Sequence, residues 1–222
     1  MIRPLIYPNR CIFCGELVRK ETVCTDCLKR VVELTAEVCL RCGASPENCN
    51  CRARAFAFRR NISAFSYEGP ARSVLLRFKQ RNRPQLRKFI AKRMYYHITA
   101  RLGNDFDSLV YVPQSYKSFR ERGYYPLKLL AKELSKSLGL PVLSPLKRIG
   151  NTQQKYVDPN QRWYNAKRNY ALHKGAQLQG KVLLIDDLFT SGATLNACAE
   201  LLRQAGADEV YTATFAIAAK KS

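Results

Sequence analysis

One segment of the 222-residue sequence indicates the architecture most clearly: Val182-Leu-Leu-Ile-Asp186-Asp187-Leu-Phe-Thr190-Ser191-Gly192-Ala193-Thr194. Its apolar first half predicts a buried strand that ends in two acids. Its second half predicts a loop that opens a helix over 193–205, with Gly206 as the cap. A second strand is predicted over 209–216. The order strand, helix, strand predicts a parallel sheet with right-handed crossovers.

The sequence before this segment contains further elements of the same kind. An apolar run at 109–113 predicts a strand, and 124–138 has helical periodicity. Two more helices are predicted, over 71–79 and over 84–102, the second with Pro84 in its first turn. We therefore expect an α/β fold in which helices flank a parallel sheet.

The same segment has the composition of a site for a phosphorylated sugar. Ligands bind such sheets at the carboxyl ends of strands, where loop N–H groups and a helix N-terminus can hold an anion. Thr190, Ser191 and Thr194 add hydroxyl donors. Asp186 and Asp187 would repel a bare anion, but a sugar diol over them, or Mg²⁺ close by, removes that conflict. The arrangement predicts a ribose 5-phosphate ligand.

Cysteines dominate the other end of the chain. Eight of the nine lie in the first 51 residues, in four close pairs. Two such pairs can complete a tetrahedral zinc site, and reduced thiols favour metal over disulfides or a thiol redox role. We expect a double zinc ribbon with two zinc ions, although an interleaved pairing would use the same residues. The predicted sets are Cys11, Cys14, Cys24 and Cys27 for one ion, and Cys39, Cys42, Cys49 and Cys51 for the other.

The charge balance indicates a polyanionic partner. The sequence has 38 Lys and Arg residues against 17 Asp and Glu residues, a formal net charge of +21. Residues 52–93 contain thirteen of these cations and one acid, with aromatic residues between them. A solvated helix face is the alternative, but so one-sided a field favours phosphate-backbone binding with weak sequence specificity. The candidate nucleic-acid residues are Arg72, Arg77, Lys79, Arg81, Arg83, Arg87 and Lys88.

No apolar run approaches the roughly 18–20 residues that span a bilayer. The first residues also make a poor signal peptide. We therefore expect a soluble, cytoplasmic protein without membrane insertion, in which the lone Cys198 is a buried small apolar residue.

The 182–194 segment resembles the phosphoribosyl pyrophosphate (PRPP) signature of type I phosphoribosyltransferases. Combined with the cysteine pairs, it makes the whole chain similar to the ComF (competence protein FC) family, whose members join a zinc ribbon to a phosphoribosyltransferase-type domain. Further matches are the 66–79 segment, Val112-Pro113, Arg120-Glu-Arg122-Gly123-Tyr124 and the spacing of polar residues over 152–170. Tyr125 stands where the family usually has Asn.

This resemblance implies roles for individual residues. Asp186 and Asp187 would hold the ribose 2′- and 3′-hydroxyls. The 5′-phosphate would be bound by the loop residues Thr190, Ser191, Gly192, Ala193 and Thr194. The pyrophosphate would be bound by Gln114, Ser115, Arg120 and Arg122. A cover over the acceptor would include Thr152, Gln154, Arg162 and Asn165.

The resemblance also implies an organisation and a role. We expect a double zinc ribbon over 1–54 and a phosphoribosyltransferase-like domain over 55–222. The implied role is the handling of incoming single-stranded DNA in competence, with PRPP and Mg²⁺ bound and with partner proteins of DNA uptake. Two alternatives stay open: an active transferase acting on a base, an amine or a nucleic acid, and a PRPP sensor without turnover. No residue stands out as a general base for turnover.

Overall fold

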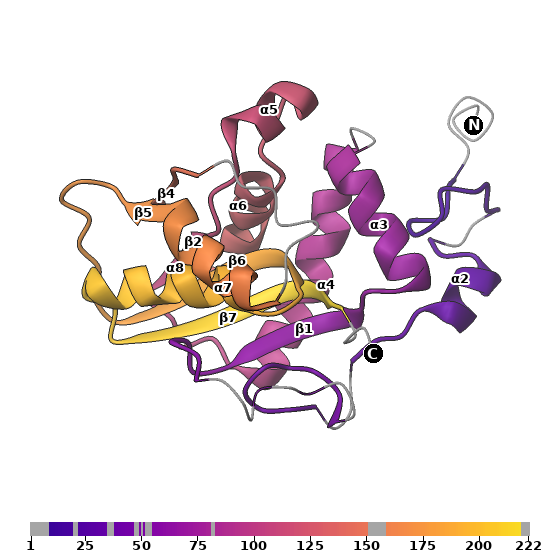
Figure 1. The fold of residues 1–222 in the computed structure, drawn as a ribbon. Helices are drawn as coiled ribbons and strands as arrows, with labels where there is room; N and C mark the ends of the chain where they lie inside the picture. The colour runs from indigo at the N-terminus through magenta and orange to yellow at the C-terminus, as the bar shows by residue number, and fades with distance from the viewer. Residues whose placement is uncertain are drawn as a thin grey trace.

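A five-stranded parallel sheet forms the centre of the molecule (Figure 1). The computed structural model describes residues 9–19, 22–34, 38–46, 49, 51, 55–80, 83–150 and 159–218. The strand order is β1-β7-β6-β2-β3, and β4 and β5 pair separately as an antiparallel ribbon. The strands are β1 Asn61–Ser66, β2 Ser108–Tyr111, β3 Val142–Leu143, β4 Leu146–Arg148, β5 Tyr170–Leu172, β6 Lys181–Phe189 and β7 Glu209–Ile217.

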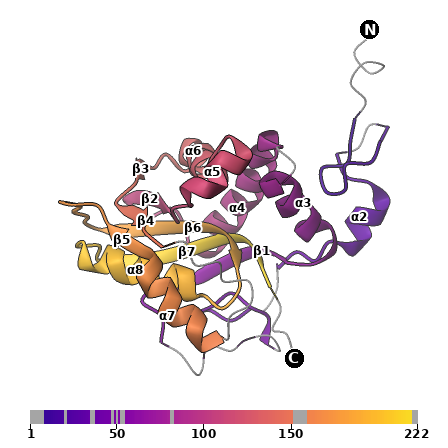
Figure 2. The same cartoon turned by 45° about the horizontal axis from the view of Figure 1, so that its top comes forward.

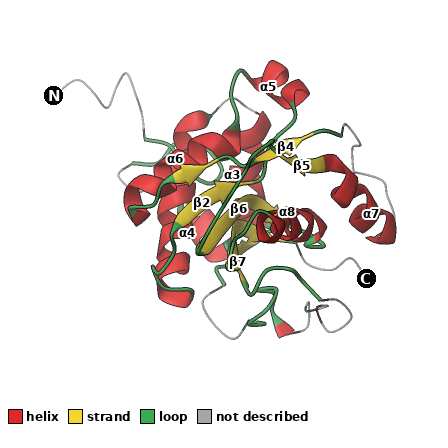
Figure 3. Ribbon diagram, turned by 90° about the vertical axis from the view of Figure 1, so that its left-hand side faces the viewer, coloured by secondary structure: helices red, strands yellow, loops and turns green. Residues whose placement is uncertain are grey.

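Helices cover both faces of this sheet. Figure 3 shows α3, α4 and α6 on one side and α7 and α8 on the other. The helices are α2 Thr25–Arg30, α3 Gly69–Gln80, α4 Arg87–Arg101, α5 Tyr116–Arg122, α6 Pro126–Leu138, α7 Pro159–Asn169 and α8 Ala193–Gln204, with a 3₁₀ turn η3 at Pro84–Leu86. The expected α/β class, with helices flanking a parallel sheet, is confirmed.

The core lies between the sheet and its helices because the central strands are apolar on both faces. In β6, the four residues Val182, Leu183, Leu184 and Ile185 are fully buried. Phe215 of β7 packs against Phe65 and Phe89, with ring centroids 5.0 and 6.3 Å away. A strand that is continuously apolar is typical of a parallel sheet covered on both sides.

Most of the predicted elements lie where the sequence indicates, and two differ in detail. The helix predicted over 84–102 begins as the 3₁₀ turn η3 before α4. The helix predicted over 193–205 ends at Gln204 with Ala205 as its cap, so the prediction of Gly206 as cap was wrong. Gly206 instead takes φ +105° one residue later, where a Cβ would lie 2.5 Å from the Leu178 carbonyl oxygen.

The cysteine-rich segment is attached to the sheet at several points. Residues 31–34 run along the outer edge of β1, where the Leu34 N–H donates to the Ala64 carbonyl and the Ser66 N–H donates to the Val32 carbonyl. Figures 1 and 2 place α2 beside α3. This pairing covers an edge strand that would otherwise expose unpaired backbone groups. Among the described residues, no helix has the length and apolar character needed to cross a bilayer.

Candidate functional site

The acid pair lies at the carboxyl end of β6, between two neighbouring strands. Ile185 is in register with Tyr111 of β2, and Asp186 is in register with Thr214 of β7. Asp187 is buried at 4% exposure, and its N–H donates to Asp186 Oδ1 at 2.8 Å. This is the position at which parallel sheets bind their ligands.

Lys79 of α3 reaches the acid pair from the neighbouring layer. Its Nζ lies 2.7 Å from Asp187 Oδ1, and both side chains are largely shielded from solvent. Burial alone would lower the pKa of Lys79, but the charge of Asp187 and the hydrogen bond to it raise that pKa overall. A buried ammonium therefore neutralises one of the two carboxylates.

Asp186 is the second carboxylate, and among the described residues no salt bridge involves it. Its burial and the neighbouring negative charge of Asp187 raise its pKa to about 8, and the positive charge of Lys79 offsets this only in part. A carboxyl group in this state is stabilised by a cation or by hydroxyl donors. A sugar diol supplies two such donors.

The loop after β6 turns sharply at Gly192. This residue has φ +77°, and a Cβ there would lie 2.8 Å from the rings of Phe189 and Phe56. Only glycine fits such a position without strain. The Ser191 hydroxyl accepts from the Ala193 N–H at 3.4 Å, and α8 begins at Ala193 with no acid in its first turn. The start of α8 is thus open to an anion.

The β4–β5 ribbon packs against α8 and contains Arg148 and Tyr170. Tyr170 is buried, burial raises the pKa of its phenol, and its hydroxyl accepts from Arg148 Nη1 at 3.5 Å. The Arg148 guanidinium lies 5.7 Å from the centre of the Tyr170 ring. The charge of Asp186 acts on Tyr170 as well. Sequence reasoning did not single out Arg148, because a lone basic residue in a short strand carries no pattern.

The residues expected at the pyrophosphate have capping contacts in this structure. The Gln114 Oε1 accepts from the Leu127 N–H at 3.0 Å at the start of α6. The Ser115 hydroxyl accepts from the Ser118 N–H at 3.2 Å as the N-cap of α5. Arg120 is exposed and Arg122 is partly exposed on α5. Their role at a pyrophosphate stays a prediction.

The predicted cover is described only in part. Thr152 and Gln154 lie outside the described residues, and the side chain of Arg162 does as well. Asn165 lies on α7, a helix that sequence reasoning did not predict. The preceding Trp163 packs against Ala166, Ala193 and Ala197, so α7 is docked on the start of α8. At least this part of the cover is a packed helix.

The eight N-terminal cysteines form two compact clusters. Cys11, Cys14, Cys24 and Cys27 make one, and Cys39, Cys42, Cys49 and Cys51 make the other; within each, the sulfur atoms lie within 4.8 Å of one another. The structure therefore groups them sequentially, not in the interleaved pairing. A Zn–S bond of about 2.3 Å implies S···S separations of about 3.8 Å in a tetrahedron.

The sulfur geometry and its surroundings suit zinc. The Cys14–Cys24 and Cys42–Cys49 sulfur atoms are 3.8 and 3.7 Å apart, and Cys39–Cys51 are 3.3 Å apart, all too far for a disulfide. Burial alone would raise the pKa of Cys11 and of Cys39, but backbone N–H groups facing their sulfur atoms lower both to about 6. Each tetrad thus contains one thiol with a lowered pKa, and two tetrads of this geometry fit two zinc ions. Cys198 is fully buried in α8, as predicted.

The predicted nucleic-acid residues divide into two groups. Three have partners within the chain: Arg77 donates to the Ile12 and Phe13 carbonyl groups, Lys79 pairs with Asp187, and Arg87 pairs with Glu133. Three others are exposed on or next to α3 and α4, namely Arg72, Arg83 and Lys88. Arg81 lies outside the described residues. The basic segment thus has fewer exposed cations than its sequence suggests.

Comparisons with known proteins match both ends of the chain. The family model of the double zinc ribbon domain matches residues 2–56, and that of the phosphoribosyl transferase domain matches residues 120–222. Competence protein F from Haemophilus influenzae is 28% identical over 216 residues, covering 90% of this chain and 93% of that protein. Competence protein ComFC from Bacillus subtilis is 27% identical over 202 residues, covering 84% and 80% respectively.

A solved structure gives a weaker likeness. Adenine phosphoribosyltransferase from Saccharomyces cerevisiae has a TM-score of 0.42 at 17% identity, over 63% of this chain and 72% of that one. The similarity to the relatives named for competence extends over most of this chain. The chain therefore joins a segment that matches a double zinc ribbon domain to one that matches a phosphoribosyl transferase domain, and over most of its length it is similar to competence proteins F and ComFC.

Proposed function

We propose that this protein binds PRPP with Mg²⁺ at the carboxyl end of β6 and handles single-stranded DNA in the cytoplasm, as natural transformation requires. The observation that carries the first part is the acid pair of β6, in which Asp187 is buried, followed a few residues later by the Gly192 turn into α8. We propose two structural units, residues 1–54 and residues 55–222. The first unit stabilises the second and provides a surface for DNA-uptake partners.

The proposed binding mode follows from the charges around the acid pair. Asp186 and Asp187 accept hydrogen bonds from the ribose hydroxyls, while loop 190–194 receives the 5′-phosphate. Lys79 cancels the charge of Asp187, so the phosphate next to it is not repelled. Asp186, with its raised pKa, gains most from the two hydroxyl donors of a diol.

The residues present also fit Mg²⁺. Carboxylate oxygens are the ligands that Mg²⁺ prefers, and within the described part of the chain no salt bridge engages the carboxyl group of Asp186. Asp186 and Asp187 would be the residues closest to the ion. When bound, Mg²⁺ would neutralise the pyrophosphate of the ligand.

The DNA part of the proposal is supported by charge and exposure. The formal net charge of +21 attracts a polyanion, and Arg72, Arg83 and Lys88 are exposed on or next to two adjacent helices. Contacts of this kind bind phosphates without reading sequence. A protein that handles incoming DNA of any sequence needs this property.

The decisive experiment is calorimetric titration of PRPP and Mg²⁺ into the wild type and into an Asp186→Asn/Asp187→Asn variant. Asparagine keeps the size of each side chain but removes the charge. The matched control is Asp105→Asn, an exposed acid beside the start of β6. We expect binding by the wild type and the control, and a loss of at least about a hundredfold in the double variant.

Each outcome bears on the proposal. Absence of heat with the wild type would contradict PRPP binding, and unchanged affinity in the double variant would contradict the assigned site. Zinc content and circular dichroism establish that the variants fold. Pyrophosphate release in the same samples, with bases, amines or single-stranded DNA added, separates an active transferase from a sensor.

The DNA part has its own test. An Arg72→Ala/Arg83→Ala/Lys88→Ala variant is compared with a Lys128→Ala/Lys132→Ala/Lys136→Ala control, which removes three exposed cations from α6. Affinity for single-stranded DNA is measured across salt concentrations. We expect the first variant to lower the salt slope by about 0.7 for each lost phosphate contact. Equal slopes in both variants would contradict the assigned surface.

A further inference from the structure

The short helix α5 is not part of the core. None of its seven residues is buried, and Figures 1 and 3 show it projecting from the body of the molecule. Its ends are fixed locally, by the Ser115 N-cap and by Gly123 at φ +74°. Residues 115–125 therefore form an arm that is anchored to the body at Tyr124, whose ring lies 6.4 Å from that of Phe78, while the helix itself buries none of its side chains.

Three aromatic rings nevertheless stack along this arm. The Tyr116 and Phe119 rings are 5.9 Å apart with an interplanar angle of 27°, and those of Phe119 and Tyr125 are 4.8 Å apart at 21°. Tyr116 is at one end of this stack and is 67% exposed. Tyr125, which departs from the family pattern, is the ring at the other end. A pre-formed stack with an exposed end ring offers a flat apolar face at little entropic cost.

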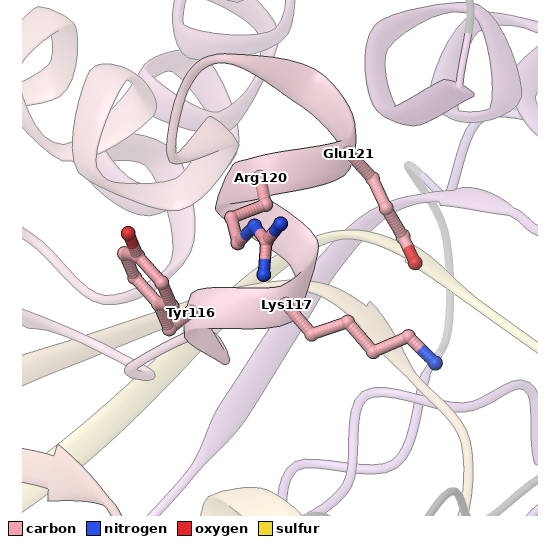
Figure 4. A pocket seen from close by; sticks show the side chains of 4 residues that line it. All are labelled: Tyr116, Lys117, Arg120 and Glu121. Atoms are coloured by element: carbon pink, nitrogen blue, oxygen red, sulfur yellow. The ribbon is translucent and has the colours of Figure 1, made fainter.

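Cations surround the exposed ring. Tyr116, Lys117, Arg120 and Glu121 line a hollow of about 640 Å³ (Figure 4). In Figure 4, the Arg120 guanidinium lies between the Tyr116 ring on one side and Lys117 and Glu121 on the other. No salt bridge within the described part of the chain involves Lys117 or Arg120. The hollow thus combines a stacking surface with two cationic donors, Lys117 and Arg120, and one carboxylate, Glu121.

The arm also lies at the edge of the sheet where the acid pair is found. It follows β2 directly, and β2 runs parallel to β6 with Tyr111 in register with Ile185. The carboxyl ends of both strands therefore meet at one edge. A strand of nucleic acid held by the arm would pass the proposed PRPP pocket.

We propose that the 115–125 arm binds unpaired bases of a single-stranded nucleic acid, with one base stacked on Tyr116 and its phosphates held by Lys117 and Arg120. The inference rests on the proposed function for the kind of partner. Its stacking face lies outside the basic helices and the PRPP loop, and it shares Arg120 with the predicted pyrophosphate contacts. Stacking on an aromatic ring requires a base that is not paired, and it tolerates any sequence.

The test compares Tyr116→Ala with Tyr96→Ala, a tyrosine of similar exposure at 56% on α4. Binding is measured to oligo-dT, to an abasic oligonucleotide of the same length and to duplex DNA. We expect Tyr116→Ala to weaken oligo-dT binding about five- to a hundredfold and to leave abasic binding unchanged. Tyr116→Phe keeps the ring and should bind as the wild type does. Lys117→Ala/Arg120→Ala should weaken binding to both single strands and lower the salt slope.

The outcomes separate this inference from the function on which it rests. Two results would overturn base stacking on Tyr116 and leave the DNA proposal standing. One is a Tyr116→Ala variant that binds oligo-dT with wild-type affinity, and the other is a wild type that binds oligo-dT and abasic strands equally. Equal binding of duplex and single strands would also overturn it. A wild type that binds none of these ligands contradicts both proposals. PRPP titration of Tyr116→Ala, expected to be unchanged, shows that the pocket is intact.

Discussion

The zinc ribbons and the α/β body are stabilised in opposite ways. Within the described part of the ribbon region, the buried residues are mostly cysteines, while Leu17, Leu28 and Leu40 are 62%, 65% and 69% exposed. The body buries its large side chains, among them Phe65 and Phe215, between sheet and helices. A segment that exposes its leucines cannot fold through an apolar core. We therefore expect the ribbons to need bound metal to fold, whereas the body has an apolar core of its own.

Removing a zinc ligand should have the largest effect and should separate the two regions. In Cys42→Ser, a buried ligand of the second tetrad is lost. Because bound zinc supplies the folding free energy of such a small site, we expect zinc content to fall from two to one ion per chain and the second ribbon to unfold. The measurements are elemental analysis and circular dichroism.

The control for this variant is Cys198→Ala, which changes the one cysteine outside the tetrads. It should keep both zinc ions. Complete unfolding of the body in Cys42→Ser would show that the two regions are not stabilised independently. That result would remove the basis of the comparison.

A core cavity should destabilise the body and spare the ribbons. Phe215 is fully buried on β7 against Phe65 and Phe89. We expect Phe215→Ala to lower the free energy of unfolding by about 3–5 kcal/mol, measured by urea denaturation, with zinc content unchanged. Phe215→Leu should cost less because it leaves a smaller cavity. If the Phe215→Ala variant folds but loses zinc, this would contradict the separate stabilisation of the zinc ribbons and the α/β body.

The junction between the regions should show an intermediate effect. Arg77 on α3 donates to the carbonyl groups of Ile12 and Phe13, at 2.8 and 3.0 Å, inside the first cysteine knuckle. We expect Arg77→Ala to lower stability by about 1–3 kcal/mol, because two buried carbonyl groups lose a charged donor. It should also raise the rate at which a chelator removes zinc. Arg72→Ala, an exposed change on the same helix, should stay within about 0.5 kcal/mol.

The smallest effect should come from the acid pair and should depend on pH. The folded state raises the pKa of Asp186 to about 8, well above its ordinary value, so unfolding releases a proton near neutral pH. The wild type should therefore lose stability as pH rises through 8, whereas Asp186→Asn should not. Between pH 7 and pH 9 the variant should gain about 1 kcal/mol relative to the wild type. Parallel stability curves would mean that Asp186 is ionised throughout.

Patterns within a few residues predicted the chemistry of both regions. The cysteine pairs indicated zinc, and the 182–194 segment indicated a strand, an acid pair and a phosphate loop. Both predictions rest on side chains that lie close together along the chain, so spacing alone reports their geometry. The order strand, helix, strand over 182–216 predicted a parallel sheet, because a helical crossover joins two strands that run in the same direction.

Other features depended on contacts between distant segments. β1 and α5 are short and have no distinctive periodicity, so they were not predicted. Lys79 and Arg77 looked like members of a phosphate-binding row, but folding places α3 between the first cysteine knuckle and Asp187, where each residue has a partner. A charged side chain near an acid across the fold pairs with it because burial makes an unpaired charge costly. Sequence spacing carries no information about contacts between segments that are distant along the chain, so only the tertiary structure decided these pairings.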